Sequence, residues 1–284
     1  MNNRNPSLDP DRPYAVVRER EPDGRGGQVD VTTVFLTASE CPIGCSMCDL
    51  WQNTLQIPTP SGAIVRQLVA AIGDVSPSGW IKLYNSGNFF DPQSIPPSDY
   101  RAIAERLAGF DRVIVENHPK FGRRRLSEFR DSIDARLEVA VGLETVQPRW
   151  LDRLGKQMSR GDFDRYASLL RTEDVDLRVF LIVGVPGVSA REAIRWARLS
   201  VRHAVHVGAR HVSLIPARAG HGWNGRSDEL PAITTPDLAD LLASSIDDAG
   251  GRASVTMDLW DQDVHDRMVG QMNVWNLNQR VTVS

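Results

Sequence analysis

Short runs of apolar and β-branched residues recur along the middle of the chain and predict strands. In the run VFLIVGV the apolar residues are continuous, which fits a parallel sheet covered on both faces better than a sheet with one face open to water. Six strands are predicted in this way, at 31–38, 80–85, 112–115, 137–143, 177–185 and 211–215.

Segments whose apolar residues are spaced three and four apart lie between these runs and predict helices. Polar residues stand at several of the predicted starts, and Ser98 is one candidate N-cap. Because strand and helix alternate, we expect an α/β protein built from parallel βαβ units. Periodicity alone leaves two arrangements open, a partial barrel and an open doubly wound sheet. The predicted helices are 62–72, 98–108, 124–133, 162–170 and 190–207.

The two ends of the chain differ from this regular middle. Residues 1–30 are rich in Pro, Arg, Asp and Gly, so we expect a polar N-terminal extension rather than a core element. After residue 218 the pattern loosens into AGHGWNGRSDELPAITTP, a long loop of the kind that is often functional. One more helix at 238–248 and a last strand at 253–259 follow. We therefore expect a core at 31–218 and a closing segment at 219–284 that covers one end of it.

Composition narrows the class of protein. Of 284 residues, 41% are hydrophobic and 24% are charged, as in soluble globular proteins. No apolar run approaches the roughly 20 residues of a membrane helix, and the first residues lack the apolar core of a signal peptide, so we expect no membrane association and a cytoplasmic location. The net charge of −3 supplies no global basic field for binding nucleic acid.

All three cysteines of the chain lie in one short segment, ECPIGCSMCDLW, as Cys41, Cys45 and Cys48. An odd number of clustered thiols does not suit a disulfide framework and indicates metal. The segment follows the first predicted strand, and ligand sites of parallel sheets form at the carboxyl ends of strands. Pro42 and Gly44 allow a tight turn, so that three sulfurs can converge.

Two metal sites are compatible with three thiols. A structural zinc site normally takes four ligands, and the nearest histidine in sequence, His118, fits no zinc-finger spacing. Thiolates are also the ligands of iron–sulfur clusters, and three of them leave one iron of a four-iron cluster free to bind a substrate.

The CxxxCxxC spacing resembles the signature of the radical S-adenosylmethionine (SAM) superfamily, with Met47 at a position that is often aromatic there. The resemblance implies that Cys41, Cys45 and Cys48 bind a [4Fe–4S] cluster and that SAM chelates its unique iron. It implies that one electron splits the sulfonium and that a 5′-deoxyadenosyl radical abstracts hydrogen from a substrate. It also implies a partial (β/α)6 TIM-type barrel with the cluster at its open top, and an electron donor such as flavodoxin or ferredoxin.

The resemblance further implies a shell of residues around SAM at the ends of the second, third and fourth predicted strands. Ser86 and Gly87 match a short glycine-containing motif, although Asn88 stands near the place of the family's acidic residue. Glu116 and Glu144 end their strands on the same face, where a carboxylate can bind ribose hydroxyls or an ammonium group. An ordinary turn and solvated strand ends would give the same sequence pattern.

Longer phrases, among them YNSGNFFDPQSIP, VIVENHPKF and HVSLIPARAG, are similar to a subgroup of predicted iron–sulfur oxidoreductases near the elongator-type and archaeosine-biosynthesis radical SAM enzymes. The likeness spans residues 31–218. Within it, Lys156 and Arg160 are either cofactor or substrate contacts or solvated helix-end charges. The turn at 184–187 either permits close approach of a ligand or is a plain strand-to-helix turn. Ile215 with Pro216 either offers an apolar wall to adenine or, in the case of Ile215, packs in the core.

The substrate stays open at this point, and no catalytic acid, base or final hydrogen donor can be named. A small molecule is favoured over RNA because the chain is acidic. A basic run (residues 120–125, KFGRRR) could still form a rim for RNA phosphates together with Lys156 and Arg160, as in an RNA-modifying radical SAM enzyme. The alternative from a different class is a zinc-binding protein without catalysis.

Overall fold

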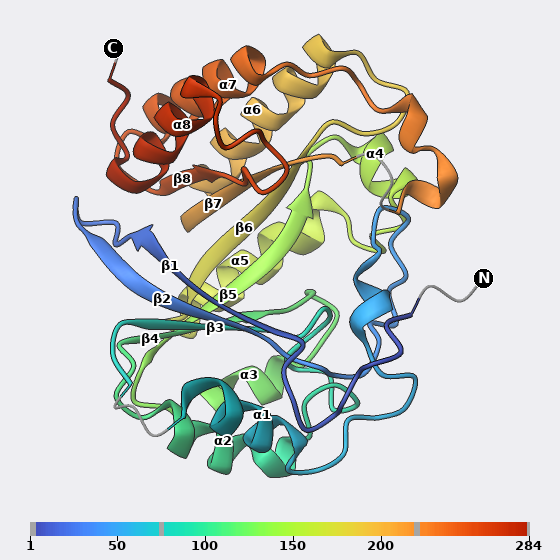
Figure 1. Cartoon of the computed structure of the whole chain (residues 1–284), viewed down its shortest axis with the longest axis vertical. Coiled ribbons are helices and arrows are strands. Elements are labelled where there is room, and N and C mark those ends of the chain that lie inside the picture. The colour runs from blue at the N-terminus through green and yellow to red at the C-terminus, as the bar shows by residue number, and fades with distance from the viewer. Residues whose placement is uncertain (1–3, 74–76, 219–221, 283–284) are drawn as a thin grey trace.

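Eight strands form one curled sheet in the computed structural model, which describes residues 4–73, 77–218 and 222–282. Each strand bonds to the next in sequence, from β1 to β8, and every pair after the first is parallel. An open doubly wound sheet would reverse its strand order, so the predicted partial barrel is confirmed (Figure 1). The strands are β1 (Ala15–Pro22), β2 (Gln28–Phe35), β3 (Trp80–Tyr84), β4 (Arg112–Glu116), β5 (Arg136–Glu144), β6 (Asp176–Val183), β7 (Ala209–Pro216) and β8 (Ser254–Met257).

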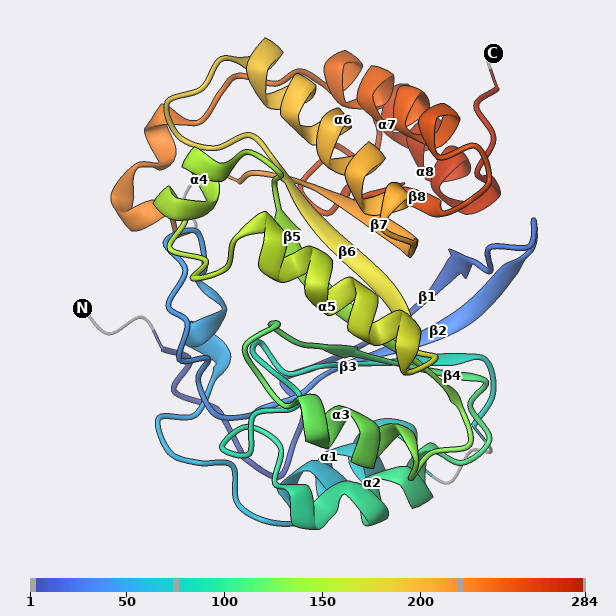
Figure 2. The same ribbon diagram turned by 180° about the vertical axis from the view of Figure 1, so that it is seen from behind.

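Helices cover the convex face of this half-barrel, as Figure 2 shows from behind. The six predicted helices are all present, and Ser189 caps α6 by accepting the N–H of Glu192. Ser98 is not an N-cap, because α2 begins two residues later, after a short turn of 3₁₀ helix. The helices are α1 (Ala63–Ile72), α2 (Tyr100–Leu107), α3 (Arg123–Arg130), α4 (Pro148–Arg153), α5 (Arg160–Thr172), α6 (Ala190–His206), α7 (Thr235–Ala249) and α8 (Arg267–Asn278).

The strands alternate between two environments. In β6, Val179 and Leu181 face the helices and are fully buried in the main apolar core. Arg178 and Phe180 point to the opposite, concave face. The apolar layer between sheet and helices therefore holds the half-barrel together, and the concave face is left to carry polar and aromatic groups.

Residues 15–22, expected to lie in an extension, form β1 instead. This strand pairs antiparallel with β2 along its whole length. Its last charged side chain, Glu21, is buried and paired with Arg178 and Lys82 on the concave face. The charged sequence AVVREREP does not predict a strand whose end is buried, because the charge of Glu21 is neutralised by residues from distant strands.

The free edge of β8 is covered by two side-chain amides from the end of α8. Asn276 donates to the carbonyl of Met257 at 2.9 Å and accepts its N–H at 2.8 Å. Gln279 does the same for Val255, at 2.9 Å and 2.6 Å. These amides replace the next strand that a closed barrel would have, and they protect an edge that could otherwise pair with another chain.

We predict that the double variant Asn276→Ala/Gln279→Ala is less stable and associates at high concentration. Each lost hydrogen bond costs about 1 kcal/mol, and the bared edge becomes available for strand pairing. Urea unfolding and light scattering measure the two effects. The control is Gln271→Ala on the same helix, whose side chain bonds Thr282 instead. A double variant as stable and as monodisperse as the control would refute this role.

Candidate functional site

Four segments meet at the carboxyl edge of the half-barrel. The cysteine loop (residues 41–48) follows β2, a short turn follows β3, and β4 and β5 end in Glu116 and Glu144. Figure 1 shows the segment after β2, in blue, beside α4 at this edge. The structure thus brings together segments that the sequence separates by about a hundred residues.

Neighbouring segments hold the cysteine loop in place. The N–H of Ser46 donates to the carbonyl of Leu154 at 2.9 Å, and Gln157 Nε2 donates to the carbonyl of Ile43 at the same distance. From the segment after β7, Gly222 packs so closely that an added Cβ would lie 2.1 Å from the carbonyl oxygen of Met47. The loop is therefore fixed by residues that follow β5 and β7. Residues 219–221, which begin the predicted loop there, lie outside the described residues.

The three thiols are half-buried and influence one another. Burial, together with the neighbouring Cys45 and Cys41, raises the pKa of Cys48 to about 11. Burial also raises the pKa of Cys45, although the ammonium group of Lys156 lowers it. Three soft sulfurs with a nearby cation are a donor set that fits an iron–sulfur cluster. Among the described residues, no three His, Cys, Asp or Glu side chains converge on the position of a single metal ion.

The turn after β3 lies against this loop. Ser86 has a positive φ of 54°, and a Cβ added to Gly87 would lie 3.5 Å from the Cβ of Cys41. Asn88 donates from Nδ2 to the sulfur of Cys41 at 3.2 Å. Gly87 and Asn88, two of the residues expected in the SAM shell, therefore lie next to the first cysteine.

Glu116 organises the same turn. Its Oε2 accepts the N–H of Asn85 at 3.1 Å. Burial raises the pKa of Glu116 to about 7, although backbone N–H groups of Asn85, Gly87 and Ser86 favour the ionised form. Ser86 is held on its other side by the hydroxyl of Tyr14, 3.0 Å away. Sequence reasoning missed Tyr14, which lies in the segment assigned to the extension.

We predict that Glu116→Gln makes the folding stability less dependent on pH. The folded-state pKa lies above the ordinary value of 4.5, so Glu116 favours the folded state most below pH 4.5, and this contribution is lost as the pH rises through 7. The stability of wild type relative to Glu116→Gln should therefore fall by about 3 kcal/mol from pH 4.5 to pH 8, because one pKa unit is worth about 1.4 kcal/mol. Urea unfolding at several pH values measures it; a constant difference would contradict the buried carboxyl.

Glu144 and Lys156 form a buried ion pair beside the cysteines. Glu144 Oε1 lies 2.6 Å from Lys156 Nζ, with side-chain exposures of 7% and 11%. A bulge in β5 and a positive φ of 64° turn Glu144 inward, and Gly142 leaves the room, since a Cβ there would lie 2.2 Å from its Oε1. Lys156 is therefore no solvated helix-end charge. Arg160 is exposed at the start of α5.

Solved structures of other proteins share this architecture. Methylornithine synthase aligns with a TM-score of 0.55 over 85% of this chain and 83% of that one, at 12% identity. Coproporphyrinogen III oxidase of Escherichia coli, a radical SAM enzyme, aligns with a TM-score of 0.53 over 87% and 54%, at 11% identity. SuiB of Streptococcus suis, solved with its precursor peptide, aligns with a TM-score of 0.59 over 78% and 47%, at 13% identity. The chain has the radical SAM fold.

The sequence relatives of the chain are distant. The archaeosine synthase subunit beta of Methanosarcina acetivorans is 26% identical over 181 residues, and an uncharacterised protein of Methanocaldococcus jannaschii is 23% identical over 191 residues. The matches cover 60% and 63% of this chain, and the chain spans about half the length of each relative. No family model matches the sequence. The fold that the resemblance implies is nevertheless confirmed.

Two further expectations concern the later strands of the radical SAM fold. The turn after β6 has the positive φ that its glycines permit, 96° at Gly184, but Pro231 of the closing segment packs against it. Ile215 and Pro216 end β7 and are half-buried. Both sites remain predictions for contacts with SAM.

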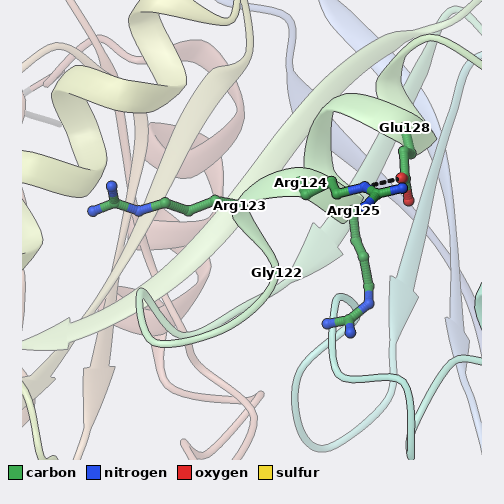
Figure 3. Close-up of a pocket in the computed structure, with 5 residues that line it drawn as sticks. All are labelled: Gly122, Arg123, Arg124, Arg125 and Glu128. Atoms are coloured by element: carbon green, nitrogen blue, oxygen red, sulfur yellow. Dashed lines mark hydrogen bonds and ion pairs between the residues drawn. The ribbon is translucent and has the colours of Figure 1, made fainter.

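The basic run does not form one continuous rim on the radical SAM fold. Arg124 pairs with Glu128 at 2.7 Å, and Figure 3 shows Arg123 pointing away from Arg124 and Arg125 around a shallow hollow. Lys156, expected to complete the rim, is buried at the cysteines. No helix in the described part of the chain is both long and apolar enough to cross a membrane.

Proposed function

We propose that the chain is a radical SAM enzyme in which Cys41, Cys45 and Cys48 hold a [4Fe–4S] cluster. The observation that carries this proposal is the meeting of three thiols with two strand-end carboxylates at the carboxyl edge of a half-barrel. Enzymes of this family bind the cluster and SAM. When bound, the cluster supplies the electron that splits the sulfonium of SAM.

The residues around the thiols have distinct tasks in this proposal. Lys156 places a positive charge beside thiols that become thiolates on binding iron. Glu144, held by Lys156, presents its second oxygen to ribose hydroxyls. Ser86 and the backbone carbonyls of its turn accept hydrogen bonds from the ammonium group of SAM, while Glu116 keeps that turn in shape.

The concave face below this edge is the proposed place of the substrate. Phe35, Tyr84 and Phe180 form a row of rings there, with centroids 6.2 Å and 6.0 Å apart, and all three stay partly exposed. Beneath them, Lys82 and Arg178 are neutralised by carboxylates. An aromatic wall over a charge-balanced floor suits an uncharged, flat part of a substrate better than a phosphate-rich one.

Anaerobic reconstitution with iron and sulfide tests the cluster. We expect about four irons and four sulfides per chain, because three thiolates and SAM complete a four-iron cluster. A chain that takes up one zinc and no iron–sulfur cluster would support the non-catalytic alternative and contradict the proposal. A reduced flavodoxin or ferredoxin is the proposed physiological electron donor.

A further inference from the structure

Asn88 is a buried amide that links the first cysteine to the turn after β4. It is only 2% exposed. Its Nδ2 donates to the sulfur of Cys41 at 3.2 Å, and its Oδ1 accepts the N–H of His118 at 2.9 Å. Each end of the amide therefore has a partner within the protein.

A chain of hydrogen bonds fixes the direction of this amide. An N–H can only donate, so the N–H of His118 requires the oxygen of Asn88 and leaves its NH₂ group toward Cys41. The ring of His118 is held in turn, because the N–H of Lys120 donates to Nδ1 at 3.2 Å and Nε2 lies 2.9 Å from the carbonyl of Lys156. This pattern places the ring proton on Nε2. Because the ring of His118 is fixed on both sides, its backbone N–H holds Asn88 in one orientation.

A donor aimed at a cluster sulfur acts on the cluster's charge. Reduction adds one negative charge, and part of it lies on the ligand sulfurs, so an N–H dipole pointing at sulfur stabilises the reduced form more than the oxidised form. The effect is strengthened by burial, because the local dielectric constant is low. The reduction potential of the cluster therefore rises with such a bond.

We propose that Asn88 is a positioning residue that raises the reduction potential of the cluster through Cys41, rather than a ligand of SAM. The inference rests on the proposed function, since it needs a cluster on the three thiols. In this role Asn88 makes electron uptake from the donor easier. Asn88 stands near the place where the family has an acidic residue. The proposed role explains the amide at this position, because a carboxylate could not donate a hydrogen bond to the sulfur.

Redox titration of the reconstituted protein, followed by the EPR signal of the reduced cluster, tests this role. Asn88→Ala removes the donor without adding charge, and Asn88→Asp keeps the acceptor for His118 while replacing the donor by an oxygen. We expect a lower midpoint potential in both variants. A ten-fold fall in the ratio of reduced to oxidised cluster at fixed potential corresponds to about 59 mV for a one-electron couple.

Gln157→Glu is the matched control. Gln157 bonds the backbone of the same loop at Ile43 and also Lys120, but its amide donates to no sulfur. Its variant reports the effect of a new carboxylate near the loop and should change the potential less than Asn88→Asp. If Asn88→Asp alone fails to fold, Asn88→Ala decides the question.

The outcomes separate the two proposals. Variants of Asn88 that hold four irons at the wild-type potential would overturn the inference and leave the proposed function intact. A loss of SAM binding at unchanged potential would return Asn88 to the SAM shell and also overturn it. A wild-type chain that assembles no cluster would overturn the proposed function itself.

Discussion

Replacing Cys45 by alanine should reduce the iron content after reconstitution from about four per chain to less than one. Cys45 is the middle thiol of the cysteine loop, and it is electrostatically coupled to Cys41 and to Lys156. Two thiolates cannot retain a cluster that already has one iron without a protein ligand. Iron and sulfide analysis of the desalted protein measures the loss, and alanine at Cys41 or Cys48 should give the same result.

Met47→Leu provides the control in the same loop. Met47 packs with the apolar group that includes Trp150 and Trp223, and leucine conserves its volume and polarity. This variant should retain about four irons. Equal iron content in Cys45→Ala and wild type would show that this thiol is no ligand.

Arg178→Met should lower the free energy of unfolding by about 3 kcal/mol, the lower end of the usual cost of breaking a buried ion pair. The loss stays at this end because Lys82 still pairs with Glu21, and Glu138 keeps two other arginine partners. Arg178 is 1% exposed and lies at the centre of the concave face. It contacts Glu21 of β1 at 2.7 Å and Glu138 of β5 at 2.9 Å. Urea unfolding at pH 7 measures the loss.

The loss of stability in Arg178→Met should depend on pH. Burial opposes ionisation, but the guanidinium of Arg178 holds the pKa of Glu21 and Glu138 below the ordinary value. Their stabilising effect is therefore present above about pH 4.5 and is lost as the pH falls below it. In Arg178→Met the carboxyl groups have lost this guanidinium, so they are protonated at a higher pH and their burial then costs less. The difference in the free energy of unfolding between wild type and Arg178→Met should therefore shrink as the pH falls from 7 to 4.

Arg198→Met is the matched control for Arg178. Arg198 pairs with Asp248 on the surface, where its side chain is 42% exposed. Such a pair contributes about 0–1 kcal/mol. If both variants lost equally little stability, the network on the concave face would not hold β1 in the sheet.

The regular elements of the fold could be predicted because their signals are local. The spacing of apolar residues marked β3 to β7 and α5 and α6, and it located the cysteine loop after a strand. The curl of the sheet could not be predicted from that spacing, since an open sheet has the same periodicity. β1 escaped prediction because Glu21 is neutralised by a residue 157 positions away.

The residues of the candidate site could be predicted, but the contacts between their side chains could not. Cysteines and carboxylates at strand ends can be placed on one edge by topology alone. The pairing of Lys156 with Glu144 could not be predicted, because it depends on a bulge that turns one side chain inward. The bond from Asn88 to Cys41 likewise depends on how two loops face each other.

Formation of 5′-deoxyadenosine tests the central claim most directly. The reconstituted protein is incubated anaerobically with SAM and dithionite, and the product is quantified by mass spectrometry. We predict 5′-deoxyadenosine from the wild-type chain and none from Cys45→Ala. A wild-type chain that carries its cluster, binds SAM and still forms no 5′-deoxyadenosine would contradict the assignment of radical SAM chemistry.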